Sequence, residues 1–531
     1  MKSKICNVLD TIAIVFVYLI LVLSDRLNWI RLDNLLYFPL ELMLIGAILL
    51  IPFAKLYIRG IVAVLLGLGL VFRLADISAF EIFARSFNPV FDAYLLLDGY
   101  GFVRSSFGTA AALLTAVLLL VLIGLIFYLS YWALGRIARL VNLSHKRSVL
   151  VLLPTIILWT VLYLGDWPRA SMWFIDQFSA HMVRIAHSVK DIREFRSVVD
   201  ADPYAEEDGL FDRLAGKDVL IVFIESYGRT LLEKTEYSPQ IRTALEEATA
   251  NLKSHGFSSR SALLHSPTVG GISWLAHATA LSGLWIDSQV RYDSLLLSDR
   301  ETLLSLFERS GWRSVGVMPA ISMAWPEGSY FGYDSLLAAP QLNYRGEPFN
   351  YVTMPDQFTL AQFQALERGQ ARQEQPLVAE IALLSSHAPW TPVPYLIDWD
   401  EVGDGTVFNE QALSGEPPEV VWQDKERVMR QYRESVEYVL NTLVSYIKVY
   451  GDEDLVVLIL GDHQPMPYVT DNSPSRDVPV HIIARDSTVM SAIEHWQWQE
   501  GMLPSLEGPV WRMDALRDEF IQAFSSELPQ D

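Results

Sequence analysis

The stretch VLIVFIES occupies residues 219–226 and decides the fold of the C-terminal part of the chain. Its apolar residues, mostly Val and Ile, run without interruption until Glu225 and Ser226. A short continuous apolar run of this kind predicts a strand that is buried on both faces of a sheet. A carboxylate that directly follows such a strand lies at the edge of the sheet where ligands bind.

Similar apolar runs recur along the C-terminal part of the chain. They are SVGVM at residues 314–318, LVAEIALL at 377–384, LVVLIL at 455–460 and VPVHIIA at 478–484. Amphipathic stretches that predict helices alternate with them, at residues 241–254, 298–309, 358–368 and 425–450. This alternation predicts an α/β domain with a mainly parallel sheet covered by helices on both faces, which we assign to residues 217–531.

Polar side chains follow three of the predicted strands. Glu225 follows the first strand, Asp462 and His463 follow residues 455–460, and His387 comes soon after residues 377–384. Because parallel strands end at the same edge of a sheet, these side chains can converge on one divalent cation. Oxygen ligands with one imidazole suit Zn²⁺ or Mn²⁺ better than Ca²⁺. The same residues also allow a simpler interpretation, in which each carboxylate caps a helix and no metal binds.

The N-terminal third has a different composition from the rest. The chain has 531 residues, is 51% hydrophobic and carries a net charge of −21. Basic residues outnumber acidic ones in residues 1–166, so the acidic excess lies in the remainder. This division indicates a membrane domain followed by a soluble one, and the acidity of the soluble part argues against a nucleic-acid partner. Cys6 is the single cysteine, which excludes an intramolecular disulfide and cysteine-ligated zinc.

Apolar segments predict a transmembrane domain of five helices within residues 1–166. The segments cover about residues 9–24, 35–54, 60–72 with a continuation past Arg73 and Asp76, 109–135 and 148–165. Glu41, Arg73 and Asp76 lie within or beside these spans, either as contacts to a lipid head group or as ordinary pairing near a span end. Residues 167–216 are expected to connect the two domains.

Charges in the loops predict how the chain is oriented in the membrane. The basic residues expected on one side are Lys2, Lys4, Lys55, Arg59, Arg136, Arg139, Lys146 and Arg147. Those expected on the other side are fewer, namely Arg26, Arg31, Arg85 and Arg104. The N-terminus is therefore expected in the cytoplasm and the soluble domain outside it. Because ATP is absent there, a group transfer would need a donor that is already activated, such as a phospholipid head group.

Four motifs, taken in order, carry a family resemblance. They are VLIVFIES at residues 219–226, SPTVGGISWLAH at 266–277, SSHAPW at 385–390 and LGDHQP at 460–465. Together with the membrane domain, they resemble the membrane branch of the alkaline-phosphatase/sulfatase superfamily. That branch contains lipoteichoic acid synthases, glucan phosphoglycerol transferases and lipid A phosphoethanolamine transferases. The resemblance implies a multi-pass protein of a bacterial plasma membrane with a periplasmic catalytic domain.

The resemblance also implies roles for individual residues. Glu225, Asp462 and His463 would bind one metal ion, Mn²⁺ or Zn²⁺, and Thr268 would be both a ligand and the nucleophile. A loop hydroxyl before a Gly-Gly turn is the alternative for Thr268. The residues implied or considered at the substrate are His387, Trp325, Ser273 and His277. For His277 a buried, hydrogen-bonded histidine is the alternative.

The implied reaction moves phosphoglycerol or phosphoethanolamine from a phospholipid to a glycan or lipid acceptor through a phospho-threonine intermediate. The alternatives are a phosphodiesterase or phosphatase with the same intermediate, and a catalytically silent lipid-binding regulatory protein. The C-x-P-x-R pattern of sulfatases is missing, which argues against a sulfatase. Lipoteichoic-type enzymes carry an arginine two residues after the pocket tryptophan, whereas this chain has Glu327 there.

Overall fold

The computed structural model describes residues 2–24, 38–51, 55–83, 85–165, 167, 169–323, 325–369 and 375–526. The chain forms two compact units. The first comprises Met1–Glu81 and Arg85–Arg193, and the second comprises Ile82–Ala84 and Glu194–Asp531.

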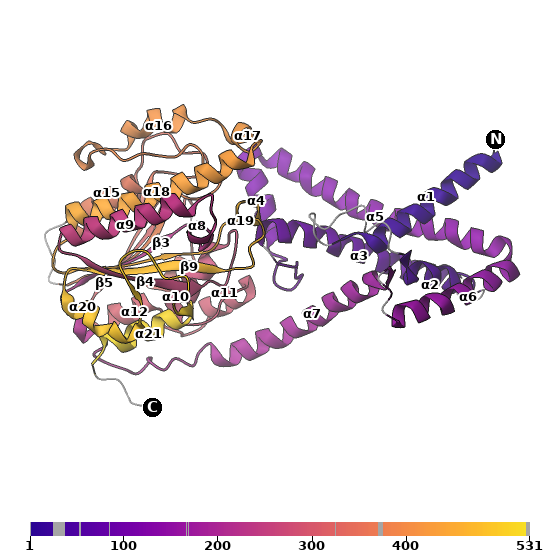
Figure 1. Ribbon diagram of the computed structural model, residues 1–531, viewed down its shortest axis with the longest axis horizontal. Helices are drawn as coiled ribbons and strands as arrows, with labels where there is room; N and C mark the ends of the chain where they lie inside the picture. Colours follow the sequence, from indigo (N-terminus) through magenta and orange to yellow (C-terminus); the bar gives the residue numbers. More distant parts are fainter. Residues whose placement is uncertain are drawn as a thin grey trace. The chain divides into compact units, whose positions relative to one another are not determined.

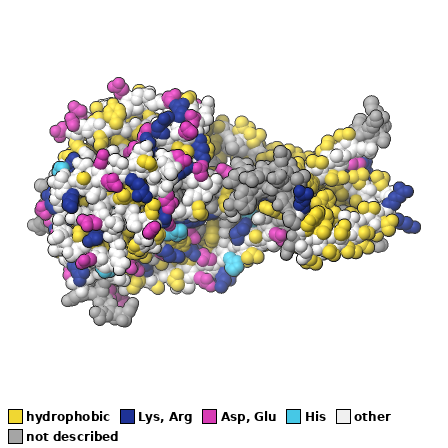
Figure 2. Space-filling view, in the orientation of Figure 1, with side chains coloured by type: hydrophobic (Ala, Val, Ile, Leu, Met, Phe, Trp, Pro, Cys, Tyr) yellow, Lys and Arg dark blue, Asp and Glu magenta, His cyan; other side chains and the backbone are white. Residues whose placement is uncertain are grey.

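The first unit is helical. Its helices are α1 (Lys2–Val22), α2 (Leu40–Ile48), α3 (Lys55–Phe83), α4 (Leu95–Phe107), α5 (Thr109–Leu143), α6 (His145–Leu164) and most of α7 (Trp173–Val198). Two short strands, β1 (Phe38–Pro39) and β2 (Ala170–Ser171), pair in parallel. Hydrophobic side chains crowd the surface of this unit (Figure 2), and those of α5 include Leu114, Leu118 and Leu120. Such a surface is expected of helices that face lipid.

The predicted number of five spanning helices is not confirmed. Within the described residues, three helices are long and apolar enough to cross a membrane, namely Tyr57–Phe83, Thr109–Leu143 and His145–Leu164, and Asn7–Val22 is a shorter apolar helix. The described part of the second predicted span contains β1 and one helix, α2, which has 9 residues. At 1.5 Å per residue it covers about 14 Å, roughly half of the hydrocarbon core. Residues 35–37 and 52–54 of that span lie outside the described residues.

The charged residues of the predicted spans have protein partners within the first unit. Glu41 accepts hydrogen bonds from the backbone N–H groups of Phe174 and Ile175 at 3.0 and 3.3 Å. Arg73 donates to the carbonyl of Ile20 at 2.8 Å, and Asp76 lies 2.7 Å from His181. These contacts favour the structural interpretation of all three, because a buried charge is stabilised when it is paired.

The second unit is built on one mixed sheet. Its strands are β3 (Asp218–Ile224), β4 (Ser258–His265), β5 (Arg313–Met318), β6 (Ser335–Ala338), β7 (Leu377–Leu383), β8 (Leu455–Gly461), β9 (Asp477–Ala484), β10 (Gln499–Glu500) and β11 (Val510–Arg512). The order across the sheet is β10-β4-β9-β8-β3-β7-β5-β6, and β11 also pairs with β4. All five predicted strands are confirmed, and β8, β3, β7, β5 and β6 run parallel. β9 is antiparallel to both of its neighbours.

Helices cover both faces of this sheet (Figure 1). One face carries α9 (Ser238–Ser254), α15 (Asp356–Phe363) and α18 (Lys425–Tyr450), and the other carries α10 (Ser273–Ser282), α12 (Leu303–Arg309), α20 (Ser487–Ala492) and α21 (Ala515–Phe524). The shorter helices are α8 (Thr230–Glu233), α11 (Gln289–Leu296), α13 (Gly328–Phe331), α14 (Ala339–Leu342), α16 (Asn409–Ser414), α17 (Pro418–Val421) and α19 (Pro467–Thr470). The sheet is thus enclosed, which explains why every residue of β3 and β8 is buried.

The sequence explains the longest helix of this unit. Asp424 caps the start of α18 by accepting hydrogen bonds from the N–H groups of Glu426 and Arg427. Apolar residues then recur at helical spacing, and Val428, Tyr432, Val436 and Val439 are fully or nearly fully buried. They pack into the main core beside residues of β3, β7 and β8. This core fixes the central strands, whose carboxyl ends carry the predicted site.

Candidate metal centre

Strand register brings the two predicted carboxylates together. Ile224 of β3 is paired with Gly461 of β8 and with Leu383 of β7. The next residues, Glu225 and Asp462, therefore leave adjacent parallel strands at the same level. Glu225, Asp462 and His463 are all buried, and one ligand atom from each can be chosen so that these atoms lie within 4.8 Å of one another. The predicted convergence of these residues is present in the structure.

Local hydrogen bonds hold the two carboxylates in place. One oxygen of Asp462, Oδ1, accepts from the backbone N–H groups of Ser226 at 2.8 Å and His463 at 2.5 Å. Ser226 has a left-handed backbone conformation with φ of 57°, which turns the chain sharply after β3. Its hydroxyl donates to Oε1 of Glu225 at 2.9 Å.

His463 presents one ring nitrogen to the carboxylates. Its Nδ1 lies 2.9 Å from the carbonyl oxygen of Gln464 and donates a proton to it. Its Nε2 lies 3.2 Å from Oε1 of Glu225 and 3.7 Å from Oδ2 of Asp462. A backbone carbonyl on the far nitrogen of a histidine fixes the tautomer that leaves the near nitrogen free to bind a metal.

The charges of the cluster perturb one another. Burial by itself would lower the pKa of His463, but Asp462 and Glu225 outweigh it and raise that pKa to about 9. Burial and the neighbouring Glu225 raise the pKa of Asp462 to about 7. Burial would also raise the pKa of Glu225, yet the charge of His463 holds it well below its usual range.

The donor set fits a divalent cation. Among the described residues, neither Glu225 nor Asp462 forms an ion pair with a lysine or arginine within 4.0 Å. Two buried carboxylates without such a partner favour a cation between them. Two oxygen ligands and one imidazole with a fixed tautomer match Zn²⁺ or Mn²⁺.

The predicted nucleophile, Thr268, lies in the loop between β4 and α10. Its side chain is buried, with 3% exposed. Its hydroxyl donates to the carbonyl oxygen of Gly271 at 2.6 Å, across the loop. Gly270 and Gly271 both have positive φ, 74° and 147°, which only glycine adopts without strain. The position of Thr268 matches the loop-hydroxyl alternative, and its role as nucleophile and ligand stays a prediction.

Ser273, predicted at the substrate, has a hydroxyl in contact with both Glu225 and His463, whereas the hydroxyl of Ser226 contacts Glu225. It is the first residue of α10 and follows Ile272, whose φ is 56°. Its Oγ donates to Oε2 of Glu225 at 2.8 Å and lies 3.1 Å from Nε2 of His463. Atoms bound to one metal at about 2.1 Å lie about 3 Å from one another, so these separations suit a shared cation.

His387 lies in the loop that follows β7, beside β3. The preceding residue, Ser386, donates to the backbone carbonyl of Glu225 at 2.5 Å. His387 itself is exposed, and its charge lowers the pKa of Glu225. An exposed imidazole beside the candidate metal centre is suited to contacting a phosphate or moving a proton, and the substrate role of His387 stays a prediction.

Trp325 and His277 belong to one partly buried network, around the buried Glu380, that the sequence did not predict. Trp325 contacts Tyr333, with ring centroids 6.3 Å apart. Tyr333 donates to Glu380 at 2.6 Å, and the other oxygen of Glu380 lies 2.7 Å from Nδ1 of His277. Glu380 is the single charged residue in the apolar run 377–384, which was the available signal. The network favours the hydrogen-bonded alternative for His277, and substrate contacts of both residues stay predictions.

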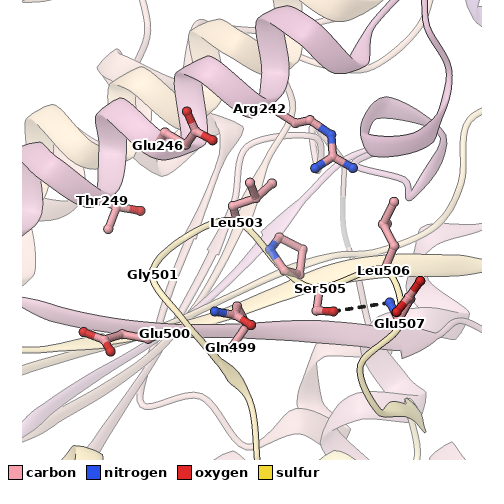
Figure 3. Close-up of a pocket in the computed structure, with 11 residues that line it drawn as sticks. Arg242, Glu246, Thr249, Gln499, Glu500, Gly501, Leu503, Ser505, Leu506 and Glu507 are labelled. Atoms are coloured by element: carbon pink, nitrogen blue, oxygen red, sulfur yellow. Dashed lines mark hydrogen bonds between the residues drawn. The ribbon is translucent and has the colours of Figure 1, made fainter.

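An open pocket elsewhere in the second unit contains none of these residues. Figure 3 shows that it lies between α9, which contributes Arg242 and Glu246, and the segment 499–507. Its other lining residues include Gln499, Glu500 and Leu503. The pocket therefore belongs to a different part of the surface from the metal centre.

Solved structures of enzymes on a related fold resemble this chain. The lipoteichoic acid synthase LtaP from Listeria monocytogenes is 14% identical with a TM-score of 0.39, and the match covers 63% of this chain and 77% of that one. The phosphoglycerol transferase GacH from Streptococcus pyogenes, in complex with sn-glycerol-1-phosphate, is 12% identical with a TM-score of 0.35. That match covers 64% of this chain and 91% of GacH. The C-terminal periplasmic domain of EptC from Escherichia coli, in complex with Zn, is 13% identical with a TM-score of 0.33. That match covers 50% of this chain and 72% of the EptC domain.

These names agree with the resemblance that the motifs predict. No family model and no curated protein sequence matches the chain.

Proposed function

We propose that this protein is a metal-dependent transferase that moves a phospho head group from a phospholipid to a glycan or lipid acceptor. The observation that carries the proposal is the buried cluster of Glu225, Asp462 and His463, with a serine hydroxyl against it, at the carboxyl ends of β3 and β8. The helical unit with its apolar surface supports a substrate that resides in the membrane.

The chemistry follows from a hydroxyl held beside a cation site. Glu225, Asp462 and His463 would hold Mn²⁺ or Zn²⁺, which when bound favours the ionised form of a neighbouring hydroxyl and neutralises charge on the transferred group. The hydroxyl attacks the phosphorus of the lipid and the diacylglycerol oxygen leaves, so that the phospho head group is joined to the protein. An acceptor alcohol then attacks the same phosphorus and frees the hydroxyl. His387 is placed to contact the phosphate or move a proton.

The proposed location is a bacterial plasma membrane, with the second unit on the periplasmic side. The uneven distribution of lysine and arginine in the first unit supports this orientation. Ser487→Cys, introduced where Cys6 has been replaced, should react in intact cells with a maleimide that cannot cross the plasma membrane but can enter the periplasm. Reaction only after lysis would place the second unit in the cytoplasm.

The reaction is tested with purified full-length protein, Mn²⁺ or Zn²⁺, and vesicles of labelled phosphatidylglycerol or phosphatidylethanolamine. The proposal predicts release of diacylglycerol and appearance of the label on an added glycan or lipid acceptor. Head-group release to water, without any acceptor, would favour the hydrolase alternative. No diacylglycerol from either lipid with either metal would reject both reactions and leave a regulatory lipid-binding protein.

A further inference from the structure

Two hydroxyls compete for the central role in the proposed reaction, Thr268 and Ser273. They lie five positions apart and on either side of Gly270 and Gly271. A nucleophile must lie against the metal site and be open to the substrate. These two requirements separate the two residues.

Thr268 is not open to a substrate, and its hydroxyl is bonded to the loop backbone. Its side chain is 3% exposed, and its hydroxyl proton is donated to the carbonyl of Gly271 at 2.6 Å. Its backbone N–H lies 3.4 Å from the hydroxyl of Ser266, which itself donates to the carbonyl of Asp462 at 2.6 Å. These bonds describe a residue that shapes the loop leading into α10.

Ser273 meets both requirements. Its Oγ lies 2.8 Å from Oε2 of Glu225 and 3.1 Å from Nε2 of His463, two atoms of the candidate metal ligands. Its side chain is half-buried, not enclosed. As the first residue of the ten-residue α10, it also lies at the positive end of a helix dipole, which favours an approaching phosphate.

The backbone explains why this serine points at the cluster. Gly270 and Gly271 have positive φ, and Ile272 is left-handed with φ of 56°. These three residues reverse the chain after Thr268, so that α10 starts beside Glu225. The bond from Thr268 to Gly271 closes this turn, which gives the threonine a structural role.

We propose that Ser273, not Thr268, is the catalytic nucleophile and a ligand of the metal; this assignment rests on the proposed function. A bond forms between Ser273 Oγ and phosphorus while the bond from phosphorus to the diacylglycerol oxygen breaks. The proton of Oγ passes to the medium, and the departing oxygen takes up one proton to become diacylglycerol. The acceptor alcohol later bonds to phosphorus, loses its proton, and Ser273 is protonated again.

The first readout is the site of covalent modification. Full-length protein in detergent is mixed with Mn²⁺ and vesicles of phosphatidylethanolamine and phosphatidylglycerol, quenched in acid, digested and sequenced by mass spectrometry. The phospho head group is expected on Ser273. The modification should be absent in Ser273→Ala and still present on Ser273 in Thr268→Val. Ser487→Ala, a change at the exposed first residue of α20, serves as the matched control.

The second readout is metal affinity, which does not depend on turnover. Ser273→Ala should weaken Mn²⁺ binding about tenfold in calorimetric titration, since one ligand is lost, whereas Ser273→Thr should retain most of the affinity and Thr268→Val should change it less than twofold. Circular dichroism confirms that each variant is folded.

A modified Thr268, or Ser273→Ala that binds Mn²⁺ as wild type does, would overturn the assignment while leaving the proposed function in place. Absence of modification at every residue, together with absence of diacylglycerol, would instead reject the proposed function and the nucleophile with it.

Discussion

Protons and the metal ion should compete for the same buried ligands. In the metal-free protein, the carboxylates of Asp462 and Glu225 raise the pKa of His463 to about 9 against the effect of burial. Burial and Glu225 raise that of Asp462 to about 7. Both groups must lose their protons to coordinate a cation, so metal binding releases protons and strengthens as the pH rises.

The two pKa values set the size of the effect. At pH 7, two units below the pKa of His463, the imidazole is almost fully protonated and Asp462 about half so. Each bound ion therefore releases about 1.5 protons at pH 7, and more at lower pH. The dissociation constant for Mn²⁺ should rise about fifteenfold between pH 8 and pH 7, and about fiftyfold between pH 7 and pH 6.

Calorimetric titration of Mn²⁺ into the full-length protein in detergent measures both quantities. Repeating it in buffers of different ionisation enthalpy counts the protons released. His255→Gln, which removes an exposed histidine, should leave the pH dependence as it is, whereas His463→Gln should remove most of it and weaken binding. A dissociation constant that changes less than threefold per pH unit would refute the assignment of these ligands.

Three further changes test the scaffold around the site by thermal unfolding of the second unit. Burial raises the pKa of Asp356 to about 7, so its ionisation should lower stability as the pH rises from about 4 to 7, by on the order of 4 kcal/mol; Asp356→Asn should flatten this dependence. Gly461→Ala should lower stability by about 3 kcal/mol, because its Cβ would lie 2.0 Å from the Tyr227 carbonyl, whereas Gly508→Ala meets only ordinary contacts at 3.4 Å. Tyr333→Phe should cost about 1–3 kcal/mol, since Glu380 loses a donor. In each case an unchanged unfolding profile would contradict the contact described.

The central strands were predictable because they are buried on both faces and therefore continuously apolar. β4 was missed because Ser258–His265 begins with polar residues, SSRS, and its apolar run is only the short ALL at residues 262–264. Its position near the edge of the sheet, beside the two-residue β10, relaxes the need for apolar residues at its start. The length of α2 was overestimated, because hydropathy measures apolar character and does not show where a helix ends.

The convergence of Glu225, Asp462 and His463 was predictable because register follows from adjacent strands that end at the same level. The sequence did not show which hydroxyl faces these three residues, because the direction of that side chain depends on the backbone conformation of residues 268–272. Glycine signals that positive φ is allowed at Gly270 and Gly271, but the left-handed conformation of Ile272 has no signal in its side chain. The network of Glu380 and Tyr333 likewise required the tertiary fold, because its members come from separate elements.

The most direct test of the account measures diacylglycerol release from labelled phosphatidylethanolamine and phosphatidylglycerol by full-length protein. The wild type is compared, with and without Mn²⁺, with Asp462→Asn, which removes a carboxylate of the centre while preserving its shape. The account predicts release that requires added metal and falls by at least about a hundredfold in Asp462→Asn. Release that persists in this variant, or that proceeds equally after chelation of the metal, would contradict it.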